Sequence, residues 1–522
     1  MSANLALLNA NIRTMNPRQP IAQAVAIAKN RIVKVGSNQE ISPLIGKGTK
    51  VVNLEGKTAV PGLIDTHIHV ADFGKCLMWL DLTRAQSIAE LQNIVKEKAK
   101  QTPSGKWIIG RGWNHNRFKE KRLLNLADLD EAAPDNPVIL YHEAAMSCAI
   151  NSKALDLAGV TKQTAIPSGG SIDKNPQTGK LMGILRDAAI NLVWQVIPEP
   201  TIDELSEATA IACQEIVKAG LTSVHWIVLS ENELAIIQRL HAEGNLPFRV
   251  NVIVPEAFVK QTVDLHSTDS LLLHVGGVVI YADGYLDSKT AALLEPYSDE
   301  PNNRGKLLCS EKALASSVAG VLVAGFQPII HAMGDKAVDT ALKVIEQTSK
   351  QQSDKSILFR IEQAAKLNEE LVERLKNQNV VVSVQPKVIA TEFAVWSATE
   401  HLGIERAKWL HPLKTLLKAG IKVAGGSDCP MEPLSPLLGM QEAVLRKVFS
   451  EQQLTVEEAL RMYTTDAAYS SSEEKIKGSI EVGKLADLTV LLNDPVTVQT
   501  DKIKEIPIEM TIINGKVVYS KS

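Results

Sequence analysis

Seven apolar runs in the middle of this chain end in polar residues in the same way. In order they are LIDTHIH, TSVHW, VVIYADG, PIIHAMGD, LFRIEQ, VVVSVQP and KVAGGSD, and each carries His, Asp, Glu or Gln at its end. In a parallel barrel the carboxyl ends of the strands converge on one face, where active sites are built. One polar strand end means little, but seven in order predict an α/β fold, a (β/α)8 TIM barrel enzyme.

Helix signals separate these runs. Capping-box patterns mark three helix starts, at Ser87-x-x-Glu90, Thr201-x-x-Glu204 and Thr455-x-x-Glu458. Gly220 and Gly420 mark two helix ends, each followed by a β-branched run. We therefore expect parallel βα units over residues 59–470. The interval of about 75–195 is less regular and predicts an inserted lid subdomain.

The two ends of the chain have the pattern of short hairpins. AVAIAKNRIVKVG alternates apolar and polar residues around Lys29-Asn30, and EMTIINGKVVYS does so around Asn514-Gly515. Asn-Gly favours the type I′ turn of a two-residue hairpin. We expect one small composite β domain built from both termini, residues 1–58 and 471–522.

Composition excludes several classes of protein. The 522 residues are 45% hydrophobic and 22% charged, with a formal net charge of −3. That balance lacks the basic surface of a nucleic-acid binder, and no apolar stretch has the length of a membrane span. The cysteines are scattered, without a CxxC pair. The N-terminus has no secretory signal pattern, so we expect a cytoplasmic protein that contacts neither nucleic acid nor membrane.

A His-x-His pair on the first apolar run is the strongest indication of a metal. His67 and His69 lie two apart on a predicted strand, so they point to the same side. His331 and Asp428 also lie at strand ends, and they would complete a four-ligand set with room for water. These side chains predict a zinc or iron site at the carboxyl face of the barrel.

Several longer motifs resemble a known family. PGLIDTHIHV, ADGYLDSKTAALLEPYSD, HAMGDKAVDTAL, GSDCPMEPLSPL and GSIEVGKLADLTVLLNDP followed by INGKVVY are similar, in order, to the amidohydrolase superfamily. The likeness is strongest to its family 3 branch, which includes N-substituted formamide deformylases. The resemblance implies a (β/α)8 barrel with a composite β domain, and hydrolysis of an amide or related C–N bond by metal-activated water.

The resemblance also assigns roles to residues. It implies that His67, His69, His331 and Asp428 bind metal, and that Asp428 is the catalytic residue that accepts a proton from the attacking water. It further implies substrate contacts for Asp283, in the Asp-Gly motif, and for His142, in the lid region.

Two positions depart from the family pattern. Val279 stands where many relatives carry a lysine that is carboxylated to bridge two metals, and Gln363 stands where the sixth strand usually carries a histidine. Valine cannot be carboxylated, and an amide is a poor zinc ligand compared with imidazole. We therefore expect one divalent ion, zinc by its ligand set, with iron and manganese as alternatives. Gln363 either orients a substrate carbonyl or is a tolerated polar residue at a lost ligand position.

Three functions follow from these residues. The first is a metal-dependent hydrolase that cleaves a non-peptide amide or related C–N bond of a small-molecule substrate. The second is a mononuclear deaminase, against which Gln363 counts because that chemistry wants a further acid beside the metal. The third is a catalytically silent relative that binds a small molecule in the old active site. The sequence leaves the oligomeric state open and is compatible with a homodimer.

Overall fold

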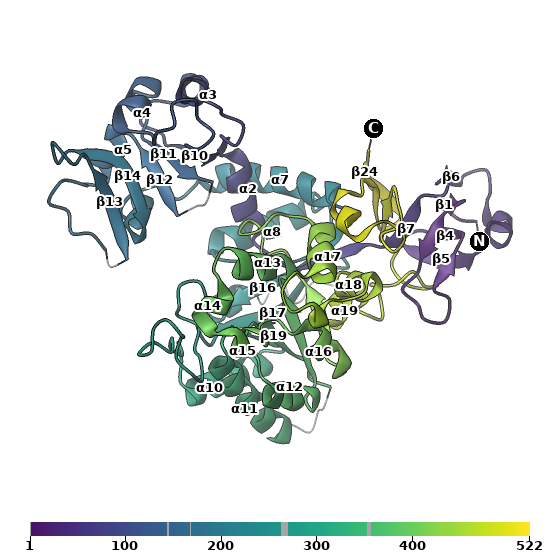
Figure 1. Ribbon diagram of the computed structural model, residues 1–522. Coiled ribbons are helices and arrows are strands. Elements are labelled where there is room, and N and C mark those ends of the chain that lie inside the picture. The colour runs from purple at the N-terminus through teal and green to yellow at the C-terminus, as the bar shows by residue number, and fades with distance from the viewer. Residues whose placement is uncertain (1, 144–145, 168, 263–269, 352–355, 522) are drawn as a thin grey trace. The chain divides into compact units, whose positions relative to one another are not determined.

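The computed structural model describes residues 2–143, 146–167, 169–262, 270–351 and 356–521. The chain forms two compact units, one made of residues 1–73 and 209–522 and the other of residues 74–208 (Figure 1). The interval 75–195, expected as an insertion, falls within the second unit. The first unit contains the barrel and the strands of both termini.

Eight parallel strands form the barrel, in the order in which they occur along the chain. They are β8 (Leu63–Ile68), β15 (Leu221–Ile227), β16 (Arg249–Pro255), β17 (Leu273–Tyr281), β18 (Gln327–Ala332), β19 (Phe359–Gln363), β20 (Val380–Val384) and β21 (Lys422–Gly425). Just past β21, a parallel bridge between Ile68 and Cys429 joins the eighth strand to the first. The expected (β/α)8 barrel is confirmed. Seven strands carry the predicted polar ends, and the remaining one, β16, ends in Pro255.

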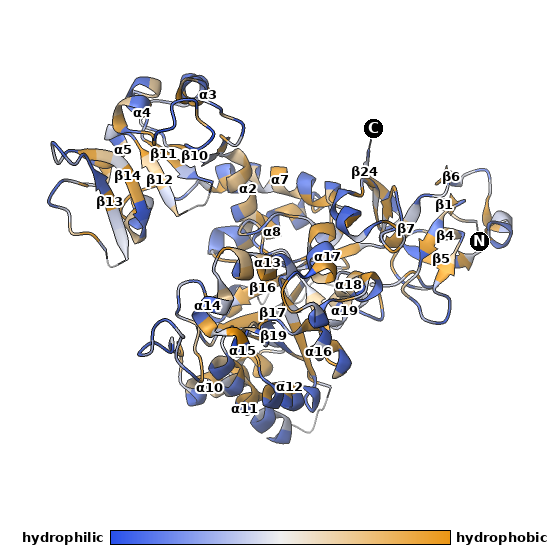
Figure 2. Cartoon of the chain, viewed as in Figure 1, coloured by the Kyte–Doolittle hydropathy of each residue, from blue (hydrophilic) through white to orange (hydrophobic). Residues whose placement is uncertain are grey.

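Helices connect the barrel strands and cover the outside (Figure 1). Gly220 and Gly420, which follow helices, both have φ of +83°, a conformation that glycine adopts without steric cost. Figure 2 shows mixed hydropathy along α11 (Asp335–Gln351), where Val338, Leu342 and Ile345 are buried at helical spacing. The other described α-helices that lie wholly in this unit are α1 (Asn38–Ile41), α8 (Glu231–Ala242), α10 (Glu311–Val323), α12 (Glu369–Lys376), α13 (Pro386–Ala394), α14 (Ala398–Leu402), α15 (Ile404–Ala407), α16 (Leu413–Lys418), α17 (Pro436–Leu445), α18 (Val456–Met462) and α19 (Thr465–Tyr469). Helices α2 (Val70–Met78) and α7 (Ile202–Lys218) run from one unit into the other.

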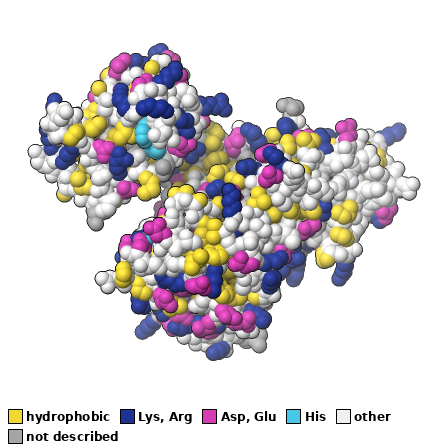
Figure 3. Space-filling view, in the orientation of Figure 1, with side chains coloured by type: hydrophobic (Ala, Val, Ile, Leu, Met, Phe, Trp, Pro, Cys, Tyr) yellow, Lys and Arg dark blue, Asp and Glu magenta, His cyan; other side chains and the backbone are white. Residues whose placement is uncertain are grey.

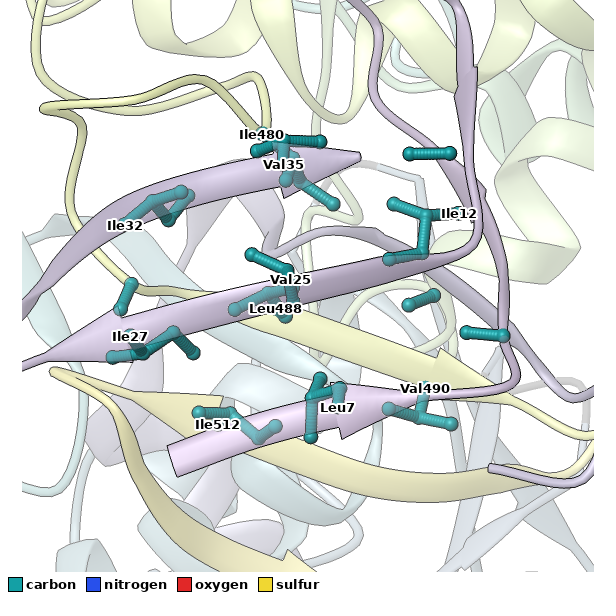
Figure 4. Packing of buried hydrophobic residues seen from close by; sticks show 14 of the residues in the cluster. Leu7, Ile12, Val25, Ile27, Ile32, Val35, Ile480, Leu488, Val490 and Ile512 are labelled. Atoms are coloured by element: carbon teal, nitrogen blue, oxygen red, sulfur yellow. The ribbon is translucent and has the colours of Figure 1, made fainter. Parts of the chain in front are cut away.

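Strands from both termini share one sheet. In it β7 (Thr58–Pro61) pairs with β2 (Asn11–Arg13) on one side and with β22 (Leu488–Leu491) on the other. The sheet also contains β3 (Ile21–Ala22), β23 (Ile508–Ile513) and β24 (Lys516–Ser520), and a second sheet contains β1 (Leu5–Leu8), β4 (Ala24–Ala28), β5 (Arg31–Gly36) and β6 (Lys50–Asn53). Figure 4 shows Leu7, Val25 and Ile27 of one sheet packed with Leu488 and Ile512 of the other.

The expected hairpins are present in these sheets. Strands β4 and β5 pair antiparallel around Lys29-Asn30, and β23 and β24 pair around Asn514-Gly515. Asn514 and Gly515 have φ of 52° and 71°, as a type I′ turn requires. The core between the two sheets is therefore built from residues of both chain ends.

The 74–208 unit contains a separate six-stranded sheet. Its strands are β9 (Leu80–Asp81), β10 (Ile108–Trp113), β11 (Val138–His142), β12 (Ser147–Ile150), β13 (Gly170–Lys174) and β14 (Leu181–Asp187). Its helices are α3 (Ile88–Gln101), α4 (Leu126–Ala132), α5 (Ser152–Leu157) and α6 (Asn191–Trp194). At the predicted start of α3, the Ser87 hydroxyl accepts a hydrogen bond from the amide of Glu90. Across the described residues, no helix is both long and apolar enough to cross a membrane.

Candidate metal centre

His67, His69 and Asp428 meet where the first and last barrel strands come together. The amide of Asp428 donates to the carbonyl of His67 at 2.8 Å, and the amide of His69 donates to the carbonyl of Cys429 at 2.9 Å. Gly426 permits this close approach, because a Cβ there would lie 2.6 Å from the His67 amide nitrogen. One ligand atom from each of the three side chains lies within 4.8 Å of the others. Backbone contacts thus hold two imidazoles and a carboxylate together.

Hydrogen bonds orient both imidazole rings. Nδ1 of His67 lies 2.9 Å from Oε1 of Glu362, and Nδ1 of His69 lies 3.3 Å from the carbonyl oxygen of Ile227. Because a carboxylate and a carbonyl only accept, each Nδ1 is the donor, and in the neutral ring that binds a metal Nε2 carries the lone pair. The two Nε2 atoms lie 3.4 and 3.6 Å from Oδ1 of Asp428. Both Nε2 atoms therefore face the carboxylate.

His331, at the end of β18, is the fourth predicted ligand. It is outside the group of three, but its ring is buried and neither ring nitrogen has a hydrogen-bond partner among the described residues. Burial lowers the pKa of His331 to about 4, so the imidazole is neutral at ordinary pH. A buried imidazole with an unused lone pair suits a metal ligand.

The electrostatics of the group fit a cation. Burial opposes charge on His67, but the carboxylates of Asp428 and Glu362 outweigh burial and raise the pKa of His67 to about 10. Burial also opposes ionisation of Asp428, yet His67 and His69 hold the pKa of that carboxyl far below its usual range. The site thus stabilises positive charge between two imidazoles and a carboxylate. A divalent ion with nitrogen and oxygen ligands matches that donor set.

Glu362 and its partners were not identified from the sequence. Besides contacting His67, the Glu362 carboxylate accepts from Arg360 at 2.8 Å, from Ser383 at 2.7 Å and from Gln385 at 3.0 Å. Glu362 is 1% exposed and Arg360 is 0% exposed. The sequence signal was the alternation of Arg360 and Glu362 about Ile361 in FRIEQ, which places both charges on one side of a strand.

Asp283 and Gln363 lie at the ends of β17 and β19. The Asp283 carboxylate accepts hydrogen bonds from the amides of Ala292, Met333 and Gly334 at 2.8 to 2.9 Å. Burial raises its pKa to about 6. Asp283 therefore joins the loops that follow β17 and β18. Its contact with substrate stays a prediction.

Gln363 has φ of 74°, and its buried Oε1 has no partner among the described residues. Its contact with substrate also stays a prediction.

Val279 packs in an apolar layer on the barrel strands. Its neighbours there are Ile227, Ile253 and Ile329, each from a different strand. The position at which the resemblance leads us to expect a lysine is thus surrounded by hydrocarbon.

His142 belongs to the 74–208 unit, where it ends β11. Its ring meets Trp113 edge to face with centroids 4.8 Å apart, and it lies 5.6 Å from the ring of His115. Burial lowers the pKa of His142. Figure 3 shows histidine exposed on this unit beside lysine and arginine side chains. The contact of His142 with substrate stays a prediction.

Comparisons with known proteins agree with this fold. Residues 50–519 match the model of the amidohydrolase family. YtcJ of Bacillus subtilis, which is named as an amidohydrolase, is 33% identical over 98% of each chain, and the N-substituted formamide deformylase of Arthrobacter pascens is 28% identical over 99% of each. A metal-dependent hydrolase of Pyrococcus horikoshii, described as uncharacterized, has a TM-score of 0.78 at 28% identity and covers 95% of this chain and 99% of its own.

The (β/α)8 barrel, the family match and the similarity to a solved metal-dependent hydrolase together define the chain as a metal-dependent hydrolase. More narrowly, the chain belongs to the amidohydrolase family.

Proposed function

We propose that this enzyme hydrolyses a non-peptide amide or a related C–N bond with one divalent ion, zinc, held by His67, His69, His331 and Asp428. One observation carries the proposal: two imidazoles whose Nδ1 atoms are engaged turn both Nε2 atoms towards the Asp428 carboxylate. The name of the formamide deformylase relative supports the choice of bond. Nitrogen and oxygen ligands favour zinc, with iron and manganese as alternatives.

The residues of the site account for the proton transfers. When bound, the ion would lower the pKa of water and polarise the scissile carbonyl. Asp428 accepts a proton as the water oxygen bonds to the carbonyl carbon and the carbonyl π pair moves onto its oxygen. As that pair returns, the C–N bond breaks and Asp428 delivers the proton to the leaving nitrogen. Glu362 and the Ile227 carbonyl keep the rings of His67 and His69 in place throughout.

A single ion follows from the two departures from the family pattern. Val279 and Gln363 leave no lysine or sixth-strand histidine for a second ion. We expect about one metal per chain in protein purified without chelator. His67→Ala should lose metal and activity together, whereas Gln363→Ala should keep the metal and change KM. Two tightly bound ions per chain, or activity without metal, would contradict the proposal.

A substrate panel tests the chemistry. N-formyl and N-acyl amines should be turned over in the presence of Zn²⁺, Mn²⁺ or Fe²⁺, and Asp428→Asn should abolish turnover. Amino-substituted heterocycles belong in the same panel, because release of ammonia from them alone would indicate a deaminase. No turnover of any compound by metal-loaded protein would favour a silent binding protein.

A further inference from the structure

Two tyrosines flank the His331 ring at the carboxyl face of the barrel. Tyr281 is the last residue of β17, and its ring centroid lies 5.1 Å from that of His331 at an interplanar angle of 41°. Tyr285 lies four residues further on, with its centroid 5.2 Å from His331 at 60°. Both rings therefore contact one of the proposed metal ligands.

The hydroxyls of these two tyrosines have unused donors. Buried tyrosine hydroxyls usually find a partner: that of Tyr297 donates to the Ala291 carbonyl at 3.1 Å, and that of the part-buried Tyr469 donates to Asn379 at 3.2 Å, whereas Tyr285 is 46% exposed. Within the described part of the chain, the hydroxyls of Tyr281 and Tyr285 make no hydrogen bond. Since the Tyr281 ring is packed against Val279 and its apolar neighbours, its position is set while its donor stays available.

The phenols of Tyr281 and Tyr285 are in the form that donates, because a tyrosine hydroxyl loses its proton only at a pH of about 10 or above.

The proposed hydrolysis needs a hydrogen-bond donor to the carbonyl oxygen of the substrate. As water adds to an amide carbonyl, negative charge develops on the carbonyl oxygen, and fixed donors aimed at it are a large source of rate. Val279 leaves β17 without the lysine expected for a second ion. Tyr281 is two residues beyond Val279 on the same strand, so the two side chains point to the same side of the sheet.

We propose that the hydroxyl of Tyr281 donates a hydrogen bond to the substrate carbonyl oxygen as that oxygen becomes an oxyanion, with Tyr285 as an auxiliary donor. This assignment rests on the proposed amide hydrolysis. It makes Tyr281 a catalytic residue whose contribution is to the transition state rather than to binding of the substrate.

The test compares Tyr281→Phe with the wild-type enzyme. The variant keeps the ring against His331, so metal content should be unchanged, while kcat should fall about 10²- to 10³-fold with KM nearly constant. A phosphonate mimic of the tetrahedral species should bind the variant more weakly by a similar factor in calorimetry, and a planar substrate analogue should bind both proteins equally. Tyr285→Phe should lose less activity than Tyr281→Phe.

Tyr469→Phe is the matched control, because its hydroxyl is engaged by Asn379, and it should leave kcat and phosphonate affinity unchanged. Wild-type turnover together with unaltered kcat in Tyr281→Phe would overturn this inference and leave the proposed function standing. If Tyr281→Phe lost affinity for the phosphonate and for the planar analogue by the same factor, that result would also overturn it. Absence of turnover of every amide by the wild type would overturn both.

Discussion

His67 shows how one side chain acquires its role from several strands. Its Nδ1 is engaged by Glu362 of β19, its carbonyl accepts from the amide of Asp428 beyond β21, and its Nε2 faces the Asp428 carboxylate. Glu362 is in turn held by Arg360, which also donates to the carbonyl of Thr66 at 2.6 Å. The orientation of a proposed ligand thus depends on a buried charge network beneath it.

Glu362→Gln should weaken metal binding without removing a ligand. An amide can still contact His67, but it loses the negative charge that fixes the Nδ1–H tautomer and makes Nε2 more basic. We expect metal affinity to fall about 10- to 100-fold. Competition with a chelator of known affinity measures this, and thermal unfolding reports separately on the stability lost by leaving Arg360 without its carboxylate.

Glu392→Gln is a suitable control for that experiment. Glu392 and His411 form another buried carboxylate–imidazole pair, with Oε2 and Nε2 2.6 Å apart, and neither belongs to the group of proposed ligands. This variant should lower stability and leave metal affinity unchanged. An equal loss of metal affinity in both variants would mean that Glu362 acts only through general stability.

At the scale of elements, ion pairs join the outer helices of the barrel. Asp339 of α11 accepts hydrogen bonds from Arg374 of α12 at 2.8 Å and from Lys343 at 3.0 Å. Burial alone would raise the pKa of Asp339, but the cations outweigh burial and lower it from 3.8 to about 2. Because the pKa is lower in the folded chain, the interaction stabilises the fold fully above about pH 4. That stabilisation is lost as the pH falls towards about 2.

Asp339→Asn should therefore have a pH-dependent effect. We expect the free energy of unfolding to fall by about 1 to 2 kcal/mol at neutral pH, with a gap between variant and wild type that narrows below about pH 4. Denaturant unfolding at a series of pH values measures this gap. Glu405→Gln, which removes an exposed pair with Lys408, should show no such trend. A gap independent of pH would contradict the assignment.

The elements also show what local patterns can predict. Alternation, capping residues and Asn514-Gly515 were sufficient for the barrel strands and the terminal hairpins, because each depends on residues close in sequence. The mixed sheet of residues 74–208 was predicted only as an irregular insertion. Its order β13-β14-β12-β11-β10-β9 combines parallel and antiparallel pairs, and the pairing of distant segments leaves no periodic signal.

For the whole molecule, we expect residues 74–208 to fold as an autonomous unit. Two apolar clusters, one around Leu91 and Leu129 and one around Ile139 and Leu185, draw their buried members only from this unit. The isolated fragment should show cooperative thermal unfolding by circular dichroism and dispersed amide signals by NMR.

A shorter fragment, residues 74–166, provides the comparison. It lacks β13 and β14, and with the residues beyond 166 it loses Ile184 of the first cluster and Ile172, Leu185, Ala189 and Val193 of the second. It should not unfold cooperatively. A disordered 74–208 fragment would show instead that the unit needs the rest of the chain.

The sequence by itself determined the barrel, the strand ends that carry His67, His69, His331 and Asp428, and membership of a hydrolase family. Each of these can be predicted from short motifs, because their chemistry or periodicity depends on residues close in sequence. Only the tertiary structure decided which residues surround them. Glu362 lies 295 residues from His67 along the chain, and His331 is reached by Tyr281 at the end of β17 and by Tyr285 in the loop that follows. Such partners are set by barrel closure and register, and spacing along one segment holds no information about contacts made across the barrel.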